Sequence, residues 1–80
     1  MHEMHLLTDL LNDLIKAARE NQAKKISKVY LRMGTFTEIN EEILRHFFAE
    51  KAKGTVAEGA EIEIEPSETR ELRLLSFDCE

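Results

Sequence analysis

Residues 4–20 read MHLLTDLLNDLIKAARE, and this stretch decides the fold because its apolar residues recur at helical spacing. Leu6 and Ile15 widen the apolar stripe, whereas Asp, Asn, Lys and Arg residues lie largely elsewhere. The stripe itself is formed by Leu7, Leu10, Leu11, Leu14 and Ala18. We therefore expect a core-facing helix that begins almost at residue 1 and fixes the terminal residues to its first turn.

The next segments alternate between strand and helix patterns. In residues 26–33, apolar residues at every second position predict one buried face, with Lys28, Tyr30 and Arg32 on the other, and Gly34 closes the strand. Asn40, followed by two glutamates, is typical of a helix N-cap. The second helix is expected to bury the stripe Ile43, Leu44, Phe47, Phe48 and Ala52.

Two more strands end the chain. Residues 61–65 alternate strictly, with Ile62 and Ile64 inward, and residues 66–69 form a turn. In the last strand the alternation slips between Leu74 and Leu75, which indicates a bulge or burial of both faces. The order helix-strand-helix-strand-strand predicts an α+β fold in which two helices pack on one small three-stranded mixed sheet. Residues 1–80 are expected to form a single domain.

Composition excludes several functional classes. The chain has 42% hydrophobic and 34% charged residues, typical of an ordered globular domain, and its net charge of -5 argues against binding nucleic acid. No apolar run approaches the roughly 20 residues that would cross a membrane. The single cysteine, Cys79, excludes an internal disulfide and a cysteine-based zinc site within one chain; it is expected to pack as a small apolar side chain. A cytoplasmic location fits best.

The start of the chain, Met1-His2-Glu3, offers a possible metal site. A terminal amine, the His2 main-chain nitrogen and the His2 ring nitrogen can close adjacent chelate rings on one ion, which suits Ni(II) or Cu(II). The alternative is a frayed terminus with one solvated histidine. His5 could reach the same ion but is expected to be a surface residue, and His46 is expected to face solvent. No catalytic constellation is visible, so an enzyme is not expected.

Several stretches together resemble a known family. Met1-His2-Glu3, the strand end YLRMG at 30–34, the segment GTVAEGA at 54–60 with EIEI after it, and the closing ELRLLS at 71–76 are similar to the hydrogenase and urease nickel-incorporation metallochaperones, the HypA/HybF family. The resemblance implies that the Met-His-Glu terminus binds nickel. The implied donors are the Met1 amine or His2 main-chain nitrogen, the His2 side chain, and the Glu3 main chain or side chain.

The resemblance also shows departures. The family's zinc domain is missing between about residues 66 and 70, so the chain is either a naturally reduced member or one from which the insertion was excised. Asn40 stands at an acidic position that resembles an accessory nickel position, where its N-cap role fits better than a metal role. The implied cofactor is therefore Ni(II), with no zinc site within this chain.

Function and partners follow as expectations. We expect a metallochaperone domain that carries and delivers Ni(II) for maturation of [NiFe] hydrogenase and, in some organisms, urease. The resemblance implies three kinds of partner: the GTPase of hydrogenase maturation, the hydrogenase large subunit and urease maturation proteins. The alternative is a small interaction or dimerisation module with incidental metal affinity. Shortening a connection between neighbouring strands favours strand exchange, so a strand-swapped homodimer is also expected.

Overall fold

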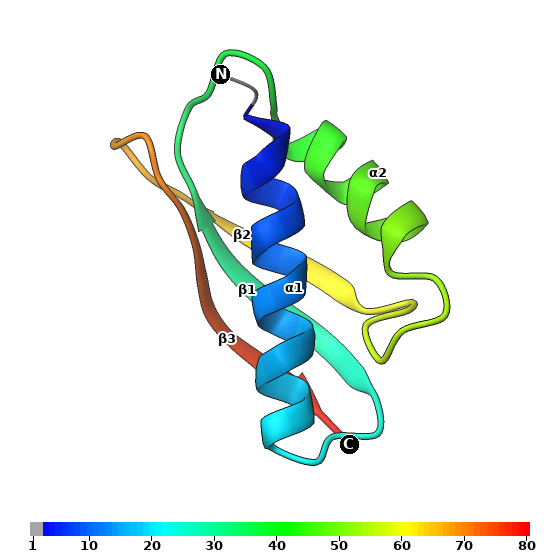
Figure 1. The fold of residues 1–80 in the computed structure, drawn as a ribbon. Coiled ribbons are helices and arrows are strands. Elements are labelled where there is room, and N and C mark those ends of the chain that lie inside the picture. The colour runs from blue at the N-terminus through cyan, green and yellow to red at the C-terminus, as the bar shows by residue number, and fades with distance from the viewer. Residues whose placement is uncertain (1–2) are drawn as a thin grey trace.

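The computed structural model describes residues 3–80, and its five elements occur in the expected order (Figure 1). They are helix α1 (Met4–Glu20), strand β1 (Ile26–Met33), helix α2 (Glu41–Lys51), strand β2 (Glu61–Pro66) and strand β3 (Leu72–Cys79). The predicted α+β class with a mixed three-stranded sheet is confirmed. Within the described part of the chain, no helix is long and apolar enough to cross a membrane.

Strand β1 is the centre of the sheet, whose order is β2-β1-β3. It pairs in parallel with β2 and antiparallel with β3. The assumption that β2 and β3 are neighbours is therefore wrong, because β1 lies between them. Residues 67–71, which join β2 to β3, must cross the end of β1, where the Ser67 amide donates to the Met33 carbonyl at 3.0 Å.

Both helices cover the same face of the sheet and enclose one apolar core (Figure 1). From β1 this core takes Val29, Leu31 and Met33, as the alternation predicted, and also Ile26. Burying these side chains is the main source of stability, because each removes a large apolar surface from water. The largest fully buried side chains are Leu7, Leu14, Ile26, Leu31, Leu44 and Val29.

Among residues 3–80, no helix covers the opposite face of the sheet, which carries paired charges. Lys28 lies 4.0 Å from Glu61 and 3.5 Å from Glu63, while the Tyr30 hydroxyl donates to Asp78 at 2.8 Å. The Glu63 carboxylate is the main reason that the pKa of Lys28 lies above its ordinary value. The three carboxylates are exposed, whereas Lys28 and Tyr30 are half-buried. Ion pairs at such a surface contribute little to stability.

Three details of burial differ from the expectations. Ile43 and Leu6 are 38% and 40% exposed, because each helix buries a narrower stripe than its apolar pattern suggested. Cys79 is exposed rather than packed, because it is the last residue of an edge strand. In contrast, the bulge is confirmed: the register with β1 shifts between Ser76 and Leu74, so Leu75 is left over and 42% exposed.

The connection from β2 to β3 is held by its own hydrogen bonds. The Glu71 carboxylate accepts hydrogen bonds from the hydroxyls of Thr69 and Ser67, which hold its pKa below the ordinary value. A carboxylate whose pKa is lowered by folding stabilises the native state above its unfolded pKa. That contribution is lost as the pH falls through the lower, folded pKa.

We therefore expect Glu71→Gln to flatten the fall in stability below about pH 5. Urea unfolding at a series of pH values measures this slope. Glu68→Gln, on the same connection but at an exposed carboxylate, is the matched control and should retain the wild-type slope. Equal slopes for the wild type and Glu71→Gln would contradict the role assigned to these hydrogen bonds.

Candidate metal centre at the amino terminus

Glu3, the first described residue, is anchored to two distant parts of the chain. Its side chain is only 5% exposed. The carboxylate accepts hydrogen bonds from the Thr37 amide at 3.4 Å and the Thr37 hydroxyl at 3.2 Å, and also from the Glu38 amide. Arg70 adds a charged hydrogen bond through Nη2. The beginning of α1 is thereby tied to the β1–α2 loop and to the β2–β3 connection.

The main chain of Glu3 is also engaged. Its amide donates to Glu38 Oε1 at 2.7 Å, and its carbonyl accepts from the Leu6 amide at 2.9 Å in the first turn of α1. Glu3 and Glu38 thus exchange hydrogen bonds in both directions, each with its side chain and its amide. This reciprocal pair fixes the backbone at the point where α1 begins.

The electrostatics of Glu3 favour the ionised carboxylate. Burial alone would raise its pKa, but hydrogen bonds from Glu38, Thr37 and Arg70 outweigh that effect and leave the pKa below its ordinary value. A buried carboxylate is tolerated only when it is paired and hydrogen-bonded, as this one is. The side chain of Glu3 therefore acts as a structural anchor in the described arrangement.

The other candidate ligands lie at different places. Met1 and His2 fall outside the described residues, so the prediction that they bind nickel stays a prediction, as does the ligand role of Glu3. His5 is exposed on the first turn of α1. Asn40 caps α2, where its Oδ1 accepts from the Ile43 amide at 2.8 Å, which confirms its expected N-cap role. Their accessory metal roles are untested.

The remaining histidine and the cysteine lie on other parts of the molecule. His46 is exposed on α2, as expected. The Lys24 amide donates to the Glu80 carbonyl, so the end of β3 that carries Cys79 lies beyond the last turn of α1, far from Glu3. Among residues 3–80, no three His, Cys, Asp or Glu side chains come together as a ready metal site.

Sequence reasoning missed the partners that hold Glu3. Thr37, Glu38 and Arg70 are polar residues in loops, separated from Glu3 by 34, 35 and 67 positions. No local spacing connects them. The only available signal was a carboxylate directly before a core-facing helix, where an ionised side chain needs partners if it is buried.

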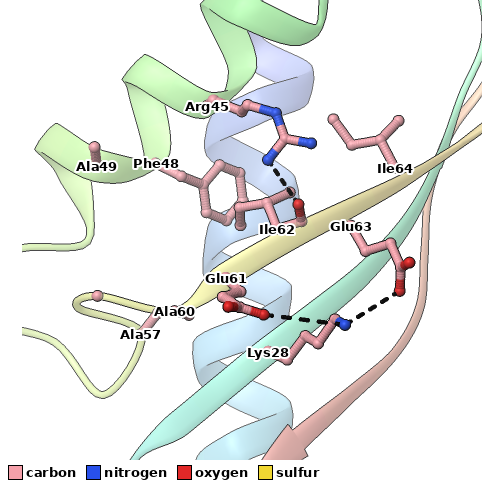
Figure 2. A pocket seen from close by; sticks show the side chains of 11 residues that line it. Lys28, Arg45, Phe48, Ala49, Ala57, Ala60, Glu61, Ile62, Glu63 and Ile64 are labelled. Carbon is pink, nitrogen blue, oxygen red and sulfur yellow. Dashed lines mark hydrogen bonds and ion pairs between the residues drawn. The ribbon is translucent and has the colours of Figure 1, made fainter.

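A separate groove of about 650 Å³ lies between α2 and the free edge of β2 (Figure 2). Its apolar lining includes Phe48, Ala57 and Ile62. Figure 2 shows Arg45 reaching from α2 to the edge, where Nη1 donates to the Ile62 carbonyl at 2.6 Å. The guanidinium also bonds Glu41 at 2.9 Å, so Arg45 links the helix to the strand.

Comparison with known proteins places these features in a family. The chain is 41% identical over 64 residues to the hydrogenase maturation factor HypA of Archaeoglobus fulgidus. The aligned segment covers 80% of this chain and 58% of that relative. It is 34% identical over 79 residues to HypA of Aquifex aeolicus, covering 99% of this chain and 66% of the relative. The chain therefore spans only part of the length of these curated relatives.

A solved structure and a family model complete the comparison. The solution structure of the Ni metallochaperone HypA from Helicobacter pylori matches with a TM-score of 0.79, covering 99% of this chain and 97% of that one. At 18% sequence identity this likeness shows the shared fold alone. The family model described as hydrogenase/urease nickel incorporation metallochaperone, HypA, matches residues 1–79, so the chain belongs to the HypA family.

Proposed function

We propose that this domain binds Ni(II) at its amino terminus and carries the ion to nickel enzymes under assembly. The observation that carries the proposal is the anchoring of Glu3, whose carboxylate and amide are both held by the loop that follows β1. In the sequence, the proposed ligands Met1 and His2 directly precede this anchored residue. The proposed ligands therefore start from a defined point on the fold.

The chemistry of Met1 and His2 suits nickel. The amine, the main-chain nitrogen of His2 and its imidazole provide a nitrogen-rich, planar set of donors, which Ni(II) and Cu(II) favour. Cu(II) should bind more tightly than Ni(II), so selectivity would come from partners and metal supply. Because amine and imidazole bind only when unprotonated, affinity should fall as the pH is lowered.

Partners are proposed from family membership. The relatives are named hydrogenase maturation factors, and the family description includes urease. We therefore propose the GTPase of hydrogenase maturation and the hydrogenase large subunit as partners, with urease maturation proteins as further candidates. We also propose that the family's zinc module has no counterpart here, because residues 67–71 alone join β2 to β3.

Calorimetric titration of Ni(II) into protein whose first residue is Met1 tests the function. We expect one ion per chain, loss of this binding in His2→Ala, and loss when extra residues precede Met1. His46→Ala is the matched control, because it removes an exposed histidine from α2 and should bind as the wild type does. If His2→Ala binds Ni(II) like the wild type, the terminal site is wrong.

One observation favours a second candidate, a protein-interaction module. The groove in Figure 2 runs along the unpaired edge of β2, and such an edge can accept an added strand from another chain. Full retention of nickel binding by His2→Ala would leave this interpretation standing. Strand exchange between two copies stays a prediction. Its basis is the short connection, residues 67–71, between two strands that do not pair with each other.

A further inference from the structure

The β2–β3 connection has a fixed conformation because its polar side chains bond one another. Ser67 Oγ donates to Glu71 Oε2 at 2.7 Å, and the Thr69 amide donates to Ser67 Oγ at 3.2 Å. The main chain is attached to the end of β1, where the Gly34 amide donates to the Glu71 carbonyl at 2.8 Å. Arg70 lies within this segment, so its Cα is held in place from both sides.

The side chain of Arg70 spans the space between two other parts of the molecule. Its Cζ lies 5.7 Å from the centre of the Phe36 ring, a cation–π distance, and its Nη2 bonds the Glu3 carboxylate. The Arg70 side chain is 64% exposed, whereas that of Glu3 is 5% exposed. Arg70 therefore covers the carboxylate from the solvent side and supplies the only full positive charge among the described partners of that carboxylate.

We propose that Arg70 is a positioning residue for the amino-terminal metal site, holding the Glu3 carboxylate as an anchor so that this carboxylate does not ligate the metal. The inference rests on the proposed function, since it concerns the same site. Glu3 serves the site because it directly follows the proposed ligands in the sequence, and Arg70 holds the Glu3 side chain in its buried position. Residues 67–71 thus contribute to metal binding without contacting the ion.

The occupancy of the two carboxylate oxygens supports this role. Oε2 accepts from Arg70 and from both the amide and the hydroxyl of Thr37, while Oε1 accepts from the Glu38 amide. Binding a metal through either oxygen would break these bonds and place a dication beside a guanidinium. Charge-assisted hydrogen bonds are about twice as strong as neutral ones, so the anchor is the favoured state of the carboxylate.

The two possible roles of the Glu3 carboxylate predict opposite changes in Ni(II) affinity when Arg70 is removed. If it is an anchor, removing Arg70 loosens Glu3 and weakens Ni(II) binding. Loss of an outer contact that orients a metal site lowers affinity about 10- to 100-fold. If the carboxylate is a ligand, removing Arg70 frees it from a competing cation, and Ni(II) should bind more tightly.

The experiment is a Ni(II) titration of the wild type, Arg70→Ala, Arg70→Lys and Arg73→Ala, with the chain starting at Met1. Arg73→Ala is the matched control, because that arginine has the same 64% side-chain exposure and carries the same charge, but pairs with Glu71 instead of Glu3. We expect about a tenfold or larger weakening for Arg70→Ala, partial rescue by Arg70→Lys, and an unchanged affinity for Arg73→Ala.

A second readout separates positioning from a general loss of stability. Amide NMR of the metal-free proteins at a temperature where all are folded should show shifts at Glu3, Thr37 and Glu38 in Arg70→Ala, with core amides unchanged. Equal Ni(II) affinities of Arg70→Ala and Arg73→Ala, or tighter binding by Arg70→Ala, would overturn the inference. Either result leaves the proposed function intact if His2→Ala still abolishes Ni(II) binding. The inference about Arg70 and the proposed function can therefore fail separately.

Discussion

Gly34→Ala should destabilise the domain by at least about 3 kcal/mol, the upper end of the usual range for overpacking. A Cβ atom on Gly34 would overlap the carbonyl oxygen of Thr69 and crowd the amide of Glu71. The obstructing atoms belong to the backbone, so no rotamer change can relieve the overlap. Relief requires the β2–β3 connection to move away from β1, which breaks the hydrogen bond from the Gly34 amide to the Glu71 carbonyl.

Urea unfolding measures this effect as a lower midpoint. Gly54→Ala is the matched control, because Gly54 has a φ of 81° but nothing within 4 Å of the added Cβ. Gly54→Ala should lower the free energy of unfolding by about 1–2 kcal/mol, the usual cost of placing a non-glycine residue in a left-handed conformation. A smaller loss of stability for Gly34→Ala than for Gly54→Ala would show that the connection can move without cost.

Leu31→Ala should cost about 2–5 kcal/mol, because it opens a cavity at a fully buried position on the central strand. A domain of this size has only about 4–12 kcal/mol of stability in total. The variant should therefore unfold at a much lower temperature than the wild type, as measured by circular dichroism.

Leu75→Ala makes the same change of side chain at a position that is 42% exposed. Much of its apolar surface stays in water after folding and no closed cavity is opened, so it should lose only about 1 kcal/mol, less than Leu31→Ala. Similar losses for the two variants would contradict the position of the core on one face of β1. The pair thus tests the placement of the sheet as well as its stability.

The fold could be predicted from sequence because its signals are local. The spacing of leucines in residues 4–20 predicted α1, and strict alternation predicted the faces of β1 and β2. Asn40 predicted the start of α2, because an N-cap interaction involves only the three residues that follow the cap. The slip at Leu75 correctly indicated a bulge, because one extra residue reverses the alternation after it.

Other features depend on distant parts of the chain. Periodicity cannot reveal that β1 lies between β2 and β3, since strand order is set by how connections cross the sheet. Ile43 shares the apolar character of Leu44, yet it is 38% exposed, because α2 buries a narrower stripe than its pattern suggests. The anchor of Glu3 joins three segments that no spacing rule connects.

The central position of β1 has a consequence for the order in which the protein can fold during synthesis. Both strands that pair with β1 are translated after it, and β3 ends only at Cys79. On the ribosome, α1 and β1 therefore emerge without a sheet to join, and long-range pairing waits for the last third of the chain. Arg70 emerges in that same third, so the Glu3 carboxylate meets its charged partner only after most of this domain has been synthesised.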